Sequence, residues 1–108
     1  MRRFASLRRQ ADFGRLRRYG RRVTTKSLVI YRDVLLSRDD PSQVGITVSK
    51  SIGKAVTRNK LRRRLAAILH EALAPYPAMR LLVIARPVAA QAPYRDLQVQ
   101  IASALASV

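Results

Sequence analysis

The sequence lacks cysteine altogether, and its 108 residues include one histidine and only six aspartates and glutamates. Without cysteine there are no disulfide frameworks, thiolate nucleophiles or cysteine-ligated zinc sites, and redox chemistry is not expected. No apolar run approaches the ~18 residues that suggest a membrane span. The basic N-terminus continues into further arginines rather than into the apolar core of a signal peptide. We therefore expect a cytoplasmic protein that is not bound to a membrane.

Residues suited to catalysis are equally scarce. A metal-dependent nuclease needs several carboxylates that converge on cations, and a metal-free ribonuclease needs a paired acid and base. Asp39 and Asp40 lie in a short polar run with a proline, which is typical of a turn. His70 is expected on the solvent side of a helix, with no partner for acid–base chemistry. We predict no catalytic residue, and no metal or cofactor bound by side chains.

Positive charge is in large excess, since 22 lysines and arginines give a formal net charge of +16. Residues 1–26 contain ten basic residues and one acid, a net of +9, and residues 49–64 contain seven basic residues and no acid, a net of +7. The remaining charges balance. Apolar residues make up 48% of the chain, which is enough for a folded core. A folded domain with this excess needs an anionic partner, such as nucleic acid or an acidic membrane surface.

Hydrophobic periodicity predicts three helices and about four strands. The helices are expected over residues 7–19, with Ser6 as N-cap and Gly20 as the stop, over residues 55–74, and from Pro93 onward. The strands are expected over residues 27–31, 44–50 and 81–85, with residues 34–37 continuing or pairing with the first. The order α-β-β-β-α-β-α indicates an α/β two-layer sandwich with a mixed sheet. We expect one domain over residues 1–108, whose basic segment 1–8 can be disordered.

The strand over residues 44–50 has two different faces. Its apolar positions alternate with the small residues Gly45, Thr47 and Ser49. A sheet face covered by small residues beside an aromatic side chain such as Tyr31 leaves room for an extended ligand. A plain solvent-facing sheet has the same pattern, so the residues alone leave both interpretations open.

The N-terminal half of the helix over residues 55–74 is a cationic surface. Pairs of polar side chains one turn apart line both borders of its apolar stripe. Arg58 with Arg62 and Asn59 with Arg63 lie along one border, and Lys60 with Arg64 lie along the other. Lys50 and Lys54 precede the helix, where positive charge meets the positive end of the helix dipole. This arrangement is unfavourable unless an anion such as phosphate is bound there. We interpret the region as a binding surface.

The run VGITVSKSIGKAVTRNKLRR, residues 44–63, closely resembles the signature of the protein subunit of bacterial ribonuclease P. Asp12-Phe13 with Gly20, residues 28–31 and residues 84–94 agree with the same family in order and spacing. The resemblance implies a subunit of an endoribonuclease that removes the 5′ leader of precursor tRNA. It implies that the RNA subunit, with Mg²⁺, performs the hydrolysis. It also implies a left-handed βαβ crossover, of a kind found in a small-subunit ribosomal protein, which the residues alone do not show.

Carried over residue by residue, the resemblance implies two surfaces. The first, the basic helix surface, would contact ribonuclease P RNA through Ser49, Lys50, Lys54, Arg58, Asn59, Lys60, Arg62 and Arg63. The second, the leader cleft, would hold the single-stranded 5′ leader of precursor tRNA through Phe13, Arg17, Tyr31, Gly45 and Thr47. Stacking and phosphate contacts suit this task because leader sequences vary. The protein is expected to be a monomer apart from the RNA complex.

The sequence departs from the family pattern in three places, which involve four residues. Lys60 stands where arginine is usual, Ala66-Ala67 replace a common Arg-Glu pair, and Arg17 occupies the place of a second aromatic residue. The last change shifts leader binding from stacking toward phosphate contact.

Two other functions stay open on the sequence: a structural ribosomal protein or general RNA chaperone of similar fold, and, more weakly because carboxylates are few, a stand-alone nuclease.

Overall fold

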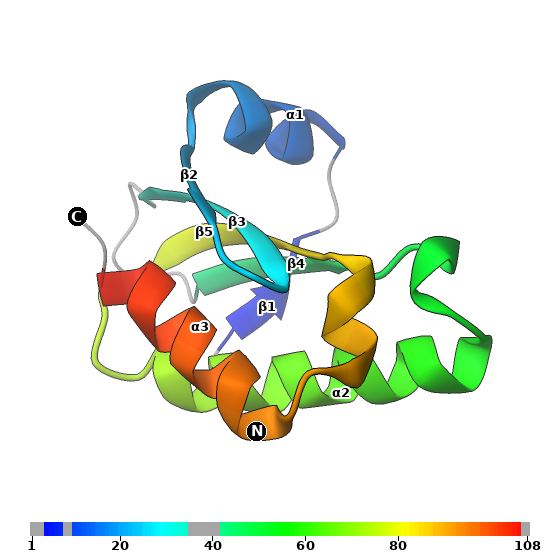
Figure 1. Ribbon diagram of the computed structural model, residues 1–108. Helices are drawn as coiled ribbons and strands as arrows, with labels where there is room; N and C mark the ends of the chain where they lie inside the picture. Colours follow the sequence, from blue (N-terminus) through cyan, green and yellow to red (C-terminus); the bar gives the residue numbers. More distant parts are fainter. Residues whose placement is uncertain (1–3, 8–9, 35–41, 107–108) are drawn as a thin grey trace.

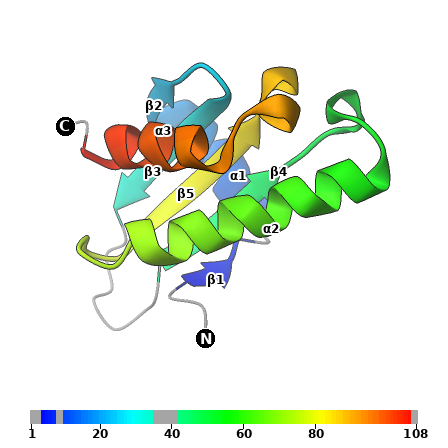
Figure 2. The same cartoon turned by 60° about the horizontal axis from the view of Figure 1, so that its bottom comes forward.

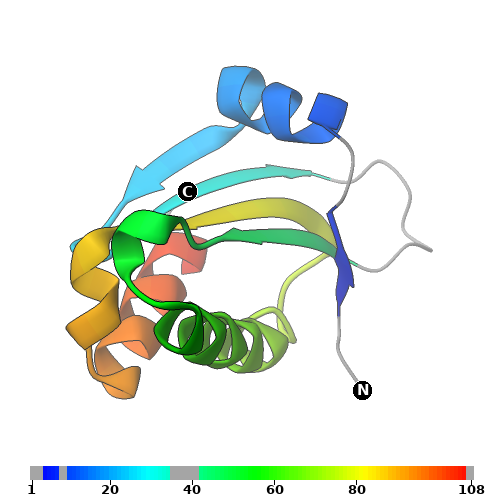
Figure 3. The same cartoon turned by 90° about the vertical axis from the view of Figure 1, so that its right-hand side faces the viewer.

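The computed structural model describes residues 4–7, 10–34 and 42–106. A five-stranded sheet has helices on both faces, with α1 on one side and α2 and α3 on the other (Figures 1 and 3). The elements are β1 (Phe4–Ser6), α1 (Gln10–Tyr19), β2 (Arg21–Thr24), β3 (Leu28–Val34), β4 (Ser42–Thr47), the 3-10 turn η1 (Lys50–Ile52), α2 (Ala55–Ala72), β5 (Met79–Ala85), the 3-10 turn η2 (Pro87–Gln91) and α3 (Tyr94–Ala106). The predicted α/β sandwich is confirmed, and α1 adds a short further layer.

The strand order is β1-β4-β5-β3-β2. Strand β4 runs parallel to β1 and β5, whereas β3 runs antiparallel to β5 and β2, so the sheet is mixed as predicted. Helix α2 connects the parallel neighbours β4 and β5. Seen from the helix side with these strands pointing upward, β5 lies to the left of β4 (Figure 2). The crossover is therefore left-handed, an exception to the usual hand of such units.

The main core lies between the sheet and helices α2 and α3. It contains the apolar side of each central strand and the predicted stripe of α2: Leu28, Ile30, Val44, Val48, Leu61, Leu65, Ile68, Leu69, Leu81, Val83, Leu97 and Ile101. The alternation in the predicted strands therefore identified the buried face correctly. Both faces of strand β5 are apolar because both are covered. Its Leu82 belongs to a second buried cluster, with Leu7 and Leu16, beneath α1.

Helix α1 ends where Gly20 was expected to stop it. The Gly20 N–H donates to the Leu16 carbonyl at 2.9 Å, and a Cβ on residue 20 would lie only 2.5 Å from that oxygen. A side chain at this position would force the last turn to shift. The glycine is thus required by the close approach of the backbone.

The N-terminal segment differs from the expectation. Residues 4–6 form β1, which pairs with β4 over residues 42–44, and both Phe4 and Leu7 are buried. This part of the segment 1–8 therefore belongs to the folded body, and Ser6 is not the N-cap of α1, which begins at Gln10. Three residues are too few to show strand alternation in a sequence. The predicted turn at Asp39-Asp40 and residues 35–37 lie outside the described residues.

Candidate nucleic-acid interface

The sheet face beneath α1 has two rows of cross-strand neighbours. In the first row Tyr31, Leu82 and Gly45 lie in register on β3, β5 and β4. In the second row Val29, Ile84 and Thr47 lie in register on the same strands. Leu82 is fully buried, but all three side chains of the second row are only partly buried. The second row thus forms a partly open floor, of which the sequence analysis had identified only Thr47.

Phe13 packs directly on Gly45. A Cβ at residue 45 would lie 2.7 Å from Cε1 and 3.1 Å from Cζ of the Phe13 ring, closer than carbon atoms can pack. The structure therefore brings these two predicted cleft residues together. It also corrects their interpretation, because the space above Gly45 is filled by the ring of Phe13. The absent side chain makes room for an aromatic residue of the protein itself.

Tyr31 packs, like Phe13, against the buried cluster of Leu7, Leu16 and Leu82 beneath α1. Its ring is partly buried in the α1 cluster, and the guanidinium carbon of Arg22 lies 6.0 Å from the ring centroid. This separation is at the outer range of a cation–π contact. Arg22 was missed by the sequence analysis because it meets Tyr31 only through the register of β2 on β3. Arg17 is exposed on α1.

The basic helix surface is mostly open to solvent. Arg58 is half-buried, and the other seven predicted residues are exposed: Ser49, Lys50, Lys54, Asn59, Lys60, Arg62 and Arg63. Helix α2 begins after Lys54 with neither a side-chain cap nor an acidic residue in its first turn. Within the described residues, none of the lysines and arginines of the basic helix surface forms an ion pair with a carboxylate. The cations predicted from sequence are therefore gathered and left unneutralised by the protein.

Arg62 is hydrogen-bonded within the fold, and its neighbour Arg58, one turn earlier, is half-buried. Arg62 donates from Nη2 to the Val48 carbonyl at 3.3 Å and from Nη1 to Asn59 Oδ1 at 3.1 Å. The Nε of Arg58 is buried without a hydrogen-bond partner. Arg62 thus has a structural contact that the sequence analysis did not foresee, since it ties α2 to the end of β4.

A hollow of about 290 Å³ joins the two predicted surfaces. Phe13 and Gly45 line it from the leader cleft, Arg62 and Ala66 line it from α2, and Phe4 lines it from β1. The leader cleft and the basic helix surface are therefore contiguous, with Arg62 at their junction. No pattern in the sequence indicated this connection, because it depends on how α1, β1 and α2 meet at the edge of β4.

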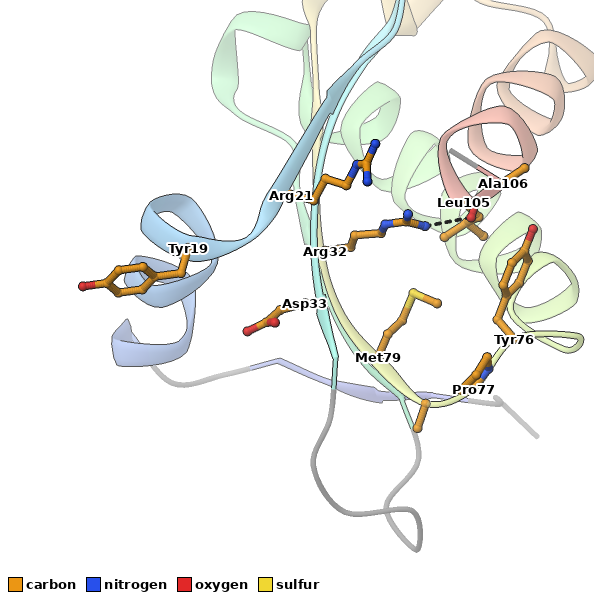
Figure 4. A pocket seen from close by; sticks show the side chains of 10 residues that line it. Tyr19, Arg21, Arg32, Asp33, Tyr76, Pro77, Met79, Leu105 and Ala106 are labelled. Carbon is orange, nitrogen blue, oxygen red and sulfur yellow. Dashed lines mark hydrogen bonds between the residues drawn. The ribbon is translucent and has the colours of Figure 1, made fainter. Parts of the chain in front are cut away.

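Another hollow, of about 510 Å³, shares no residue with either surface. In Figure 4, Arg21 and Arg32 project from the sheet toward the end of α3, and Tyr76 stands opposite them. Arg32 donates from Nη1 to the Leu105 carbonyl at 2.7 Å. A cation at a helix C-terminus is favourable, so this arginine stabilises the end of α3 against β3.

Metal and membrane sites are not found in the described residues. No group of three or more histidine, aspartate or glutamate side chains in residues 4–7, 10–34 and 42–106 lies close enough to hold a metal ion. In the same part of the chain, no helix has the length and apolar character needed to cross a membrane.

Comparison with known proteins gives one family. The family model for ribonuclease P matches residues 1–108. The ribonuclease P protein component of Thermobifida fusca is 39% identical over 109 residues, which cover 94% of this chain and 74% of the relative. That of Kocuria rhizophila is 41% identical over 102 residues, covering 94% and 88%. The structure of the Staphylococcus aureus RNase P protein matches with a TM-score of 0.81 and 29% identity, covering 93% of this chain and 91% of that one. The chain therefore belongs to the ribonuclease P protein family, the protein component that works with an RNA subunit in processing the 5′ ends of tRNA.

Proposed function

We propose that this chain binds ribonuclease P RNA through the basic helix surface and guides the single-stranded leader of precursor tRNA along the leader cleft. The observation that carries the proposal is the contiguity of the two surfaces through the hollow at Arg62. A leader bound in the cleft would emerge from the cleft next to α2, the helix proposed to bind the RNA subunit. The protein would thus hold the substrate close to the RNA subunit.

The electrostatics of α2 support the RNA contact. Six basic residues follow Gly53 within residues 54–64, and they have no carboxylate partner among the described residues. A phosphate backbone neutralises such a row and releases its condensed counterions, which supplies most of the affinity. Gly53 has a φ of 146°, so the turn that precedes α2 adopts a conformation that other residues rarely take.

The composition of the cleft supports a sequence-tolerant contact. Tyr31 offers an aromatic ring, and the floor of Val29, Ile84 and Thr47 is only partly buried. Bases of any sequence can stack on a ring, and the exposed Arg17 and Arg22 can contact the phosphates between them. A base that stacks on the Tyr31 ring would lie near the guanidinium of Arg22.

In this proposal the RNA subunit, with its Mg²⁺, performs the hydrolysis. The side chains of this chain hold no metal and donate no proton to the reaction. The protein acts in the cytoplasm as a monomer apart from the RNA complex. Its contribution to the rate is to bind and orient the leader.

Reconstitution tests the proposal. Purified protein is mixed with a bacterial ribonuclease P RNA, and cleavage of a precursor tRNA is measured as Mg²⁺ is lowered. We expect the protein to permit cleavage at Mg²⁺ concentrations at which the RNA alone is slow, and Arg95→Ala on α3 to behave as the wild type. The proposal is wrong if neither the rate nor the Mg²⁺ requirement changes. Tight binding to ribosomal RNA, with leader affinity insensitive to Tyr31→Ala, would favour a structural ribosomal protein or RNA chaperone.

A further inference from the structure

A groove of about 320 Å³ lies between α2 and η2, on the side of α2 away from Arg58 and Arg62. Figure 1 shows η2 beside the N-terminal half of α2. The lining residues are Val56, Thr57, Lys60, Leu61, Arg64, Ala89 and Ala90. Because successive helical residues are ~100° apart, Lys60 and Arg64 project on the opposite flank from the Arg58 and Arg62 row. The groove is thus separate from the hollow that joins α2 to the leader cleft.

The groove has two cations and no acid. Lys60 and Arg64 are one helical turn apart, where like charges repel. Neither side chain has a hydrogen bond or ion pair within the described residues. Arg64 is half-buried as a residue, and its guanidinium has no acidic neighbour in the lining. An anion bound between the two would relieve this repulsion.

The remaining lining indicates which kind of anion fits. Thr57 offers a hydroxyl, and Ala90 and Val56, which is 79% exposed, offer small apolar surface. Cations and a hydroxyl are the groups that hydrogen-bond to phosphate oxygens and sugars in nucleic-acid complexes, and the small apolar side chains leave space for a backbone segment. No aromatic ring is present in the lining, so the groove offers nothing on which a base can stack. This chemistry favours the sugar-phosphate backbone of a folded RNA over an unpaired leader.

We propose that Arg64 and Lys60, with η2 as the opposite wall, bind a sugar-phosphate segment of the ribonuclease P RNA. The inference rests on the proposed function and adds a second contact line to it. Helix α2 would be held by phosphates on both flanks, and Arg64, which lies outside the basic helix surface, would be one of the contacting residues. Contacts on both flanks of the helix would fix the orientation of the protein on the RNA, and with it the direction of the leader cleft.

The substitution Arg64→Ala tests this contact, since alanine favours the helix and preserves the fold. Affinity for ribonuclease P RNA is measured between about 50 and about 200 mM monovalent salt. One lost phosphate contact lowers the slope of log affinity against log salt by roughly one, so the ratio of wild-type to variant affinity falls about fourfold over this range. Arg64→Lys should restore the slope. Arg95→Ala, which removes the same charge from α3, should leave it unchanged.

A second variant separates binding from folding. Val56→Glu places a carboxylate at the groove and in the first turn of α2, where it is favourable for the helix dipole. We expect a melting temperature equal to or above that of the wild type, together with a several-fold loss of affinity for ribonuclease P RNA.

The outcomes distinguish this inference from the function on which it rests. If the wild type binds the RNA and both Arg64→Ala and Val56→Glu bind with the same affinity and salt slope, the groove is not a binding site and the proposed function stands. If the wild type does not bind the RNA, both proposals fail. If Arg64→Ala weakens binding only to precursor tRNA with a leader, the groove belongs to the leader path and the inference is wrong.

Discussion

The contact between Phe13 and Gly45 allows a prediction from geometry alone. In Gly45→Ala the new methyl group would lie 2.7 Å from Phe13 Cε1 and 3.4 Å from Cδ1 of the fully buried Leu82. Leu82 is at an ordinary contact distance, so the Phe13 ring must move. Overpacking of this kind costs roughly 1–3 kcal/mol, and replacing glycine with alanine in a strand returns about 0.5–1 kcal/mol of chain entropy. The expected net loss is about 0–2.5 kcal/mol, or up to roughly 10 °C in melting temperature.

Urea and thermal unfolding of four proteins, followed by circular dichroism, measure this coupling: the wild type, Gly45→Ala, Phe13→Ala and the double variant. Once Phe13 is shortened, the methyl group at residue 45 meets no ring, and the same substitution should be neutral or slightly stabilising. Gly14→Ala in α1 is the matched control, because a Cβ there has no atom within 4 Å. It should raise stability by about 0.5–1 kcal/mol.

Two results would refute the reasoning. One is a Gly45→Ala variant that gains as much stability as Gly14→Ala, since the ring would then have free space to enter. The other is an equal cost of Gly45→Ala with and without Phe13, because the double-mutant cycle would then show no coupling between the two positions.

Three further predictions follow from the site. Tyr31→Ala should weaken binding of a leader-bearing precursor tRNA but not of a leaderless tRNA, with little change in salt slope; equal losses on both substrates would remove this tyrosine from the cleft. Arg62→Ala should lower the slope of log affinity for ribonuclease P RNA against log salt by roughly one. It should also lower the free energy of unfolding by about 0.5–1.5 kcal/mol, because the hydrogen bond to the Val48 carbonyl is lost. An unchanged slope would leave this arginine a purely structural role. Gln100→Ala should cost about 1–3 kcal/mol in urea unfolding, because its amide bonds the Ser27 N–H and hydroxyl, while affinity for the RNA stays unchanged.

The sequence predicted the parts of this protein that depend on local pattern. Helix α2 and its buried stripe followed from the spacing of Leu61 and Leu65, and the core faces of β3 and β4 followed from alternation. The two basic segments could be counted directly, and the run over residues 44–63 indicated the family that the comparisons confirm. Such features are visible because each one repeats or concentrates within a short stretch of chain.

Tertiary structure alone decided how those parts meet. Strand β1 has three residues and no period, so its pairing with β4 exists only in the folded sheet. The Arg22 contact with Tyr31 depends on strand register, and the Phe13 contact with Gly45 depends on the placement of α1. Contacts between distant segments leave no periodic trace in a sequence, because they are selected by the packing of whole elements. The sequence therefore determined which residues are basic, buried or aromatic, and the fold determined that the cleft and the basic helix form one continuous surface.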